Sequence, residues 1–200
     1  MKSRKLNFAI IGCGSVSIDH AKAIKKLGHN ISYGSTKKIN SKNWKLFKKK
    51  FPQTEFATIN EILNNNNIDR VISCLPLNEQ KKYCKKILTS NKPILIEKPL
   101  HDNALKLKKI FAVKDSCLFN KAVAYNRRNY DVVSDLKKKI KSKKLKSVDV
   151  NISENSKYLK KKYGKNFKKV FLHVGSSTGS LAESFADVSI LFILIVSFFL

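Results

Sequence analysis

Residues 6–17 read LNFAIIGCGSVS, an apolar run that leads into two glycines and several small residues. The apolar run has the length of a buried strand, and residues 15–29 have the apolar spacing of an amphipathic helix. Gly12 permits the tight turn that must join them, and Gly14 has no side chain to keep an anion away from the backbone. The stretch therefore predicts a strand–turn–helix unit whose helix N-terminus is open to an anionic group.

Strand-like and helix-like segments alternate outward from this unit as far as residue 122. The expected strands cover residues 6–13, 30–35, 68–76, 92–100 and 117–125, and the expected helices cover 15–29, 41–52, 78–91 and 102–114. Residues 54–67 are expected to hold a short strand and a helix capped by Thr58, with Glu61 three residues further on. Because the strands are short and uniformly apolar, they predict an α/β fold, a doubly wound parallel sheet with helices on both faces.

The pattern changes beyond residue 122, so we expect one domain over residues 1–122 and a partial second domain over residues 123–200. Residues 129–143 have the spacing of an amphipathic helix, and residues 145–153 alternate as a half-buried strand does. The chain ends in the apolar run Val188–Leu200, which is shorter than the ~20 residues of a membrane-spanning helix. A buried strand or helix is expected there. A membrane tail, or an ending created by a frameshift or premature stop, is the alternative.

The composition is that of a folded chain with an unusual charge. Hydrophobic residues make up 42% of the sequence, which excludes a wholly disordered chain. The net charge of +27 comes from 41 Lys and Arg against 14 Asp and Glu, and only four of the cations are Arg. Arg is the residue that forks onto phosphates and base edges, and the Lys residues are spread along the whole chain, so nucleic-acid binding is not expected. The charge should still attract smaller anionic ligands.

The four cysteines, Cys13, Cys74, Cys84 and Cys117, form no CxxC pair and no metal-ligand spacing. They are expected to be reduced thiols of a cytoplasmic protein, and no metal site is expected. The apolar run before Gly12 is too short for the core of a signal peptide.

The residues GCGSVS at 12–17 form a glycine-rich loop of the kind that binds the diphosphate of a dinucleotide. An Asp or Glu about 20 residues further on usually binds the ribose 2′-hydroxyl of NAD. No acidic residue occurs between His29 and Glu55, and the residues at that place are Ser35, Thr36, Lys37 and Lys38. Hydroxyl and ammonium groups suit a 2′-phosphate, so NADP is expected in preference to NAD. The alternative is that these lysines are one more sample of a lysine-rich chain.

A second motif, IEKPL at residues 96–100, ends a predicted strand at the edge of the sheet where ligands bind in such folds. Two charged residues directly after a buried strand cost desolvation free energy, so they are expected to have a role in binding or catalysis. Lys98 then lies where it can reach a substrate hydroxyl or a nicotinamide ring.

These motifs, together with NIDRVISCLPLNEQ at 67–80 and AYNRRNY at 124–130, resemble the glucose–fructose oxidoreductase, inositol dehydrogenase and MocA family over roughly residues 6–170. The resemblance implies a Rossmann-type doubly wound domain followed by an incomplete, open-faced α/β second domain. It also implies hydride transfer between a nicotinamide cofactor and a hydroxyl-bearing carbon of a sugar or cyclitol. The cofactor-binding positions that it implies are Gly12, Gly14, Ser15, Val16, Cys74, Leu75, Pro76, Asn78, Glu97, Lys98, Asn126 and Arg127.

The resemblance places Lys98 near the reacting hydroxyl, but the family's Asp–His pair in the second domain has no counterpart in this sequence. The best alignment puts His173 and Ser177 at the two positions, so His173 is the candidate base. The family's second domain is also longer, which indicates a chain truncated or degenerate at its C-terminus. Three functions stay open: an oxidoreductase of sugar or surface-polysaccharide metabolism, a dinucleotide-binding remnant or regulatory protein without turnover, and a membrane-associated protein. A homo-oligomer is compatible with each of them.

Overall fold

The chain separates into two compact units, Met1–Ala124 and Tyr125–Leu200, which are described one at a time. The computed structural model describes residues 4–101, 104–112, 120–125, 129–142, 150–151 and 196–197. The first unit contains both motifs singled out in the sequence.

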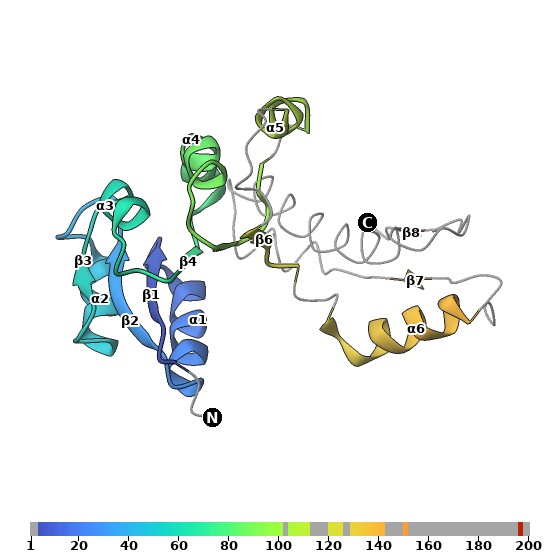
Figure 1. Ribbon diagram of the computed structural model, residues 1–200, viewed down its shortest axis with the longest axis horizontal. Helices are drawn as coiled ribbons and strands as arrows, with labels where there is room; N and C mark the ends of the chain where they lie inside the picture. Colours follow the sequence, from blue (N-terminus) through green and yellow to red (C-terminus); the bar gives the residue numbers. More distant parts are fainter. Residues whose placement is uncertain are drawn as a thin grey trace. The chain divides into compact units, whose positions relative to one another are not determined.

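A six-stranded parallel sheet forms the centre of the first unit (Figure 1). Its strands are β1 (Asn7–Ile11), β2 (Asn30–Ser35), β3 (Glu55–Phe56), β4 (Arg70–Ser73), β5 (Ile94–Ile96) and β6 (Lys121–Val123). Their order in the sheet is β3-β2-β1-β4-β5-β6, and every pair is parallel. The chain therefore builds outward from β1 on one side and then returns to build outward from β1 on the other. The predicted doubly wound parallel sheet is confirmed, with its point of reversal beside β1.

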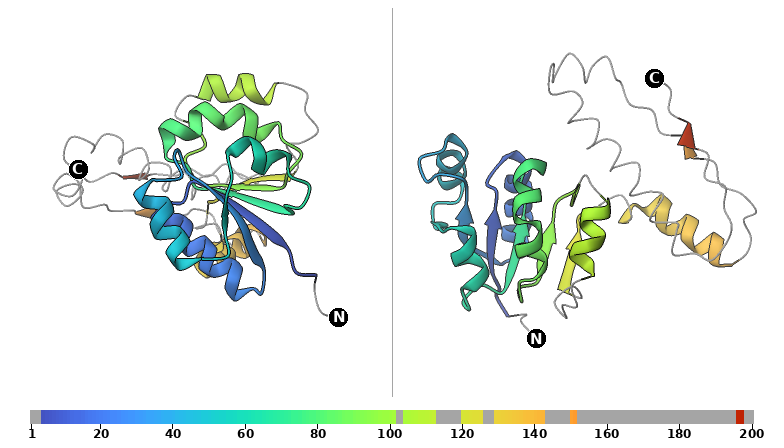
Figure 2. Two further views of the ribbon diagram at one scale, coloured as in Figure 1. Left: turned by 90° about the vertical axis from the view of Figure 1, so that its left-hand side faces the viewer. Right: turned by 90° about the horizontal axis from the view of Figure 1, so that it is seen from above.

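Helices cover both faces of the sheet (Figure 2). On one face lie α1 (Ser15–Lys26) and α2 (Lys42–Lys50). On the other lie α3 (Ile59–Asn64), α4 (Leu77–Leu88) and α5 (Ala104–Phe111). This arrangement explains why the strands are apolar on both sides of their pleat, since neither face of the sheet meets water.

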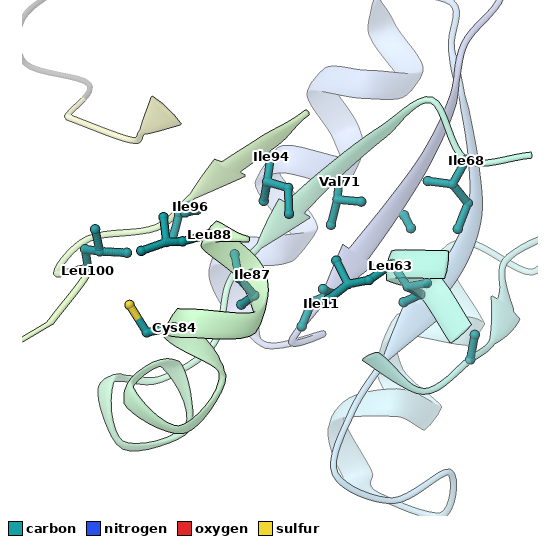
Figure 3. Packing of buried hydrophobic residues seen from close by; sticks show 13 residues of the cluster. Ile11, Leu63, Ile68, Val71, Cys84, Ile87, Leu88, Ile94, Ile96 and Leu100 are labelled. Atoms are coloured by element: carbon teal, nitrogen blue, oxygen red, sulfur yellow. The ribbon is translucent and has the colours of Figure 1, made fainter. Parts of the chain in front are cut away.

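Each face has its own hydrophobic cluster. On one face, apolar side chains of α3 and α4 pack against apolar side chains of the strands (Figure 3). The helices contribute Ile62, Leu63, Ile87 and Leu88, and the strands contribute Ile11, Val71, Ile94 and Ile96. On the opposite face Ile24 of α1 and Trp44 and Phe47 of α2 pack against Ile10, Ile31 and Ile72. Successive residues such as Ile10 and Ile11 thus enter different clusters, because side chains alternate across a strand.

The starts of the helices follow from local capping. Ser41 caps α2 by accepting a hydrogen bond from the amide of Trp44 at 3.2 Å. Thr58 and Glu61 form the predicted capping box at the start of α3. The expected start of α4 at Asn78 is wrong by one residue, because the helix begins at Leu77 with Pro76 as its N-cap residue. Proline suits this place because it has no amide hydrogen to satisfy.

The second unit contains α6 (Asp131–Lys141), the helix expected within residues 129–143, on which Val133 is buried. It also contains β7 (Val150–Asn151) and β8 (Val196–Ser197), which pair in parallel. These two strands fall within the predicted strand 145–153 and the apolar run Val188–Leu200. Among the helices of the described residues, none has the length and apolar character needed to cross a membrane.

Candidate cofactor site

The turn after β1 fits no residue but glycine at position 12. Gly12 has φ +90°, a conformation that residues with a side chain rarely adopt, and a Cβ added there would lie 2.7 Å from the carbonyl oxygen of Cys74. The amide of Gly12 donates to the carbonyl oxygen of Ser35 at 2.8 Å. The turn therefore lies closely against the residues that end β2 and follow β4.

The helix that follows this turn has an open N-terminus. Gly14 is its N-cap residue, no side chain caps it, and no acidic residue stands in its first turn. The first amides of α1, those of Ser15 and Val16 among them, have no carbonyl partner within the helix, and the helix dipole adds a partial positive charge there. A Cβ added at Gly14 would meet no atom within 4 Å. The sequence therefore folds into an anion site made of backbone alone, with room beside Gly14 for the anion.

A cleft of about 390 Å³ lies beside this turn, between the end of β2 and helix α4. Its wall includes the four residues predicted to surround a ribose, Ser35, Thr36, Lys37 and Lys38, and also Leu75. The four differ in what they offer to a ligand. Ser35 is buried. The Thr36 hydroxyl shapes its own loop, because it donates to the Lys38 carbonyl oxygen at 2.9 Å and accepts from the Ser41 hydroxyl at 3.0 Å. Lys37 and Lys38 are the cations of the cleft wall.

Glu79 of α4 also lines this cleft, a role that no motif of the sequence indicates. Lys82 donates a hydrogen bond to its carboxylate at 2.7 Å. This bond, with a smaller contribution from the charge of Lys37, lowers the pKa of Glu79. The cleft therefore combines two lysines with one carboxylate that is already paired. Glu79 lies more than forty positions from Lys37 in the chain, so only the fold brings them together.

The register of the central strands brings the segments after β4 and β5 to the same edge of the sheet. The amide of Cys74 donates to the carbonyl oxygen of Ile11 at 2.7 Å, and the amide of Glu97 donates to the carbonyl oxygen of Ser73 at 2.8 Å. Leu75, Pro76 and Asn78 continue from Cys74 into the first turn of α4. Burial, reinforced by the negative charge of Glu97, raises the pKa of the Cys74 thiol. Cys74 is therefore a neutral side chain at this edge of the sheet and not a nucleophile.

Glu97 is bound to helix α1 through His20, a contact that the sequence motifs do not predict. His20 Nε2 lies 2.8 Å from Glu97 Oε1, and each side chain is 22% exposed. The second carboxylate oxygen of Glu97 accepts the amide of Lys98 at 3.3 Å. A signal for His20 exists in the sequence, because Ser17, Ala21 and Ile24 form the buried stripe of α1 and His20 has the spacing of that stripe. A polar residue on a buried stripe needs a partner.

The structure thus brings together, within the first unit, the Gly12–Val16 turn, the cleft residues 35–38, and residues 74–78 with Glu97 and Lys98. Three of the predicted site residues, Asn126, Arg127 and His173, lie outside the described residues. The candidate base of the second domain is therefore not located.

Solved structures of longer proteins share this fold. The apo scyllo-inositol dehydrogenase of Lactobacillus casei gives a TM-score of 0.67 at 14% identity, over 84% of this chain and 51% of that one. The same enzyme with bound NAD(H) and scyllo-inositol gives 0.61 at 16% identity, over 75% and 45%. The WlbA dehydrogenase of Bordetella pertussis, in complex with NADH and UDP-GlcNAcA, gives 0.62 at 18% identity, over 78% and 49%. At such identities the likeness concerns the fold. The chain spans about half the length of these structures.

A comparison with curated proteins gave no match. The sequence profile of one family, described as an oxidoreductase family with an NAD-binding Rossmann fold, matches residues 6–121. The matched region contains the glycine turn, the cleft and the Glu97–Lys98 pair, and it is more than half of the chain. The chain therefore belongs to the Gfo/Idh/MocA oxidoreductase family, and the matched residues 6–121 form its NAD-binding Rossmann fold.

Proposed function

We propose that this chain binds a nicotinamide dinucleotide along the carboxyl edge of its sheet and takes part in hydride transfer to or from a hydroxyl-bearing carbon of a sugar or cyclitol. The observation that carries the proposal is the uncapped start of α1, which opens beside a cleft for the adenosine and beside the Glu97–Lys98 turn. The family match over residues 6–121 supports it. So do the inositol and nucleotide-sugar ligands bound in solved structures with this fold.

The residues at the edge of the sheet fit the parts of such a cofactor. The diphosphate would bind the amides from Gly12 to Val16, since the space beside Gly14 is open and no side chain competes for these donors. The adenosine would occupy the cleft beside Ser35, Thr36 and Lys37. The nicotinamide end would lie against the segment after β4, formed by Cys74, Leu75, Pro76 and Asn78, and against Glu97 and Lys98. Asn126 and Arg127 remain predicted contacts.

We further propose that the 2′-phosphate form, NADP, binds more tightly than NAD. Lys37 and Lys38 line the cleft where the ribose would lie, and ammonium groups attract a phosphate. Glu79 is the acidic residue of the cleft wall, and it already accepts a hydrogen bond from Lys82. Its repulsion of a 2′-phosphate is therefore reduced by a paired cation.

The bound nicotinamide supplies the hydride acceptor or donor, and the chain supplies groups that orient the substrate. Lys98 follows β5 at the same edge as the residues after β4, so its ammonium group is suited to hydrogen-bond the reacting hydroxyl. Oxidation of that hydroxyl also releases a proton, which needs a base. His173 is the residue that the sequence offers for that role.

A second function, dinucleotide binding without turnover, is favoured by one observation. The backbone features of the first unit, the Gly12 turn and the uncapped start of α1, are those of a binding site for a dinucleotide and need no catalytic group. Either function is compatible with the cytoplasm, the compartment that we propose. Cys13, Cys74 and Cys84 are free thiols, and free thiols are typical of reducing compartments.

The test is a calorimetric titration of the purified chain with NADPH and NADH, followed by a turnover assay with NADP and a panel of sugars, cyclitols and nucleotide sugars. We expect saturable binding of both cofactors, with NADPH the tighter. Lys98→Ala should leave the affinity for NADPH within about threefold and abolish any turnover. The variant loses the ammonium group that would bind the substrate hydroxyl, whereas the diphosphate site is unchanged. Binding of neither cofactor would overturn the proposal. Binding without turnover on the whole panel would select the second function.

A further inference from the structure

His20 and Glu97 join two segments that are 77 positions apart in the chain. His20 belongs to α1, whose N-terminus is the proposed diphosphate site, and Glu97 begins the turn that carries Lys98. An ionised carboxylate only accepts hydrogen bonds, so His20 Nε2 is the donor in this contact. The pair is therefore a direct link between the helix whose start would bind the diphosphate, in the middle of the cofactor, and the turn at the nicotinamide end.

Glu97 is held at three points, and this leaves it little freedom to act on a ligand. Its amide donates to the Ser73 carbonyl oxygen at 2.8 Å, Oε1 accepts from His20, and Oε2 accepts from the amide of Lys98. Both carboxylate oxygens thus bind groups of the protein. The carboxylate thus fixes the backbone at Lys98 through one oxygen, and the His20 imidazole fixes the carboxylate to α1 through the other.

We propose that His20 is a positioning residue, which holds the Glu97–Lys98 turn so that the nicotinamide half of the cofactor, and not its ADP half, depends on it. This inference rests on the proposed function. Without the imidazole, the half-buried Glu97 carboxylate loses a donor, and it gains by turning toward water together with Lys98. Glu97 and Lys98 then no longer hold the positions in which they would contact the nicotinamide end of the cofactor.

The ADP half should be unaffected because its contacts do not involve His20. The glycine turn is fixed by a hydrogen bond that the Gly12 amide donates to the Ser35 carbonyl oxygen. The start of α1 is fixed by a hydrogen bond that the Ser17 hydroxyl donates to the Gly14 carbonyl oxygen. The cleft for the adenosine is formed by residues after β2 and by α3 and α4. A purely structural role of His20 would weaken both halves alike, so the two halves provide the discriminating measurement.

The experiment compares NADPH with 2′-phospho-ADP-ribose, which lacks the nicotinamide, by calorimetric titration of the full chain. For His20→Ala we expect the affinity for NADPH to fall about fivefold to tenfold, while that for 2′-phospho-ADP-ribose stays within about twofold. His20→Gln should restore most of the loss, because the glutamine amide can donate to Glu97 from nearly the same place as Nε2. Thermal midpoints of all variants show whether they are folded.

His29→Ala is the matched control. His29 is also a partly buried histidine, but it accepts from the amide of Leu6 and stacks on Phe8 at the other end of β1. It should change neither affinity selectively. If His20→Ala does not fold, His20→Phe replaces it, since the phenyl ring fills a similar space without a hydrogen-bond donor and the same selective loss is expected.

Equal losses for the two ligands, or no loss for either, would overturn the inference while leaving the proposed function intact. A failure of His20→Gln to recover NADPH affinity would also overturn it. If the wild-type chain binds neither ligand, the proposed function fails and this inference fails with it.

Discussion

Two glycines only two positions apart have different roles, and this difference can be measured. Gly12 is confined by its positive φ and by Cys74, whereas Gly14 has ordinary dihedral angles and open space where a Cβ would stand. Gly12→Ala should therefore destabilise the fold by about 2–3 kcal/mol through backbone strain. Gly14→Ala should destabilise the fold less, by about 0.5–1 kcal/mol, because alanine is a poorer N-cap residue than glycine. It should lower the affinity for NADPH about tenfold, because the new methyl group occupies the approach to the backbone.

Urea unfolding and NADPH titration of the two variants check this prediction. If the Gly14→Ala variant binds NADPH as tightly as the wild type, the diphosphate does not bind at this turn. A stable Gly12→Ala variant would show that the turn can relax away from the Cys74 carbonyl group.

The preference for the 2′-phosphate depends on Lys37 and Lys38 in the adenosine cleft. Replacing both by Ala should lower the NADPH affinity about tenfold and leave the NADH affinity within about twofold, since only NADPH carries the extra phosphate. Lys45→Ala with Lys49→Ala removes the same charge from exposed positions on α2 and serves as the control. If the control lowers the NADPH affinity as much, the preference comes from the total charge of the chain and not from the cleft.

Cys13 gives the stability of the fold a dependence on alkaline pH. Burial raises the pKa of its thiol to about 12, against the opposing effect of a hydrogen bond with the backbone of Ser35. The unfolded chain ionises this thiol near pH 9, while the folded chain keeps the proton until about pH 12. The unfolded state then binds fewer protons, so the free energy of unfolding falls as the pH rises through this window.

Urea unfolding of the wild type and of Cys13→Ala at pH 7.5, 9 and 10 checks the sign. The variant is expected to be less stable at pH 7.5 because it leaves a cavity, but to lose less stability between pH 7.5 and pH 10. Parallel curves for the two proteins would contradict the prediction.

At the scale of single residues, the sequence predicts a role where the local backbone admits only one type of residue. Gly12 was predicted because a strand that turns at once into a helix needs a residue without Cβ. His20 and Glu79 were not assigned roles, because their partners Glu97 and Lys37 lie far away in the chain. The sequence contains the buried stripe of α1 but not the identity of the residue that His20 meets.

The elements were predicted well for the same local reasons. The strand expected at residues 30–35 is β2 with the same bounds, and the box formed by Thr58 and Glu61 starts α3 as expected. The order of the strands in the sheet and the pairing of β1 with β4 are of another kind. They follow from the handedness of parallel connections and from burial on both faces, which no single segment encodes.

The packing of α2 on β2 depends on Gly34. A Cβ at this position would lie 2.7 Å from Trp44 Cζ3 and 3.1 Å from the Cys13 sulfur. Gly34→Ala should therefore force α2 away from the sheet and destabilise the fold by about 1–3 kcal/mol. Trp44→Phe removes the crowded ring atoms, so we expect the double variant to be closer in stability to Trp44→Phe alone than Gly34→Ala is to the wild type.

Thermal or urea unfolding of the four proteins measures this coupling. Strictly additive losses would show that the added methyl group is accommodated without contact with Trp44. The tryptophan fluorescence of Gly34→Ala offers a second readout, because Trp44 is the only tryptophan of the chain.

At the scale of the whole molecule, the described residues of the proposed cofactor site all belong to one of the two units. The glycine turn, the cleft and the Glu97–Lys98 turn all lie in Met1–Ala124, as do the residues of both hydrophobic clusters. The first unit therefore has the core that a domain needs to fold alone, and the backbone donors that a diphosphate needs. His173, the predicted base for the substrate proton, belongs to the second unit.

This division predicts that a fragment ending at Ala124 folds and still binds NADPH, with an affinity about threefold to tenfold below that of the full chain because the predicted contacts of Asn126 and Arg127 are lost. A fragment ending at Leu100 should not fold, because it lacks β6 and α5, whose Val123, Leu107 and Ile110 pack on the first cluster. Cooperative urea unfolding and NADPH titration of both fragments provide the measurement. A folded 1–124 fragment whose affinity is more than tenfold weaker would place an essential contact beyond Ala124. Extension to Tyr130, which restores Asn126 and Arg127, would then identify it by recovering the affinity.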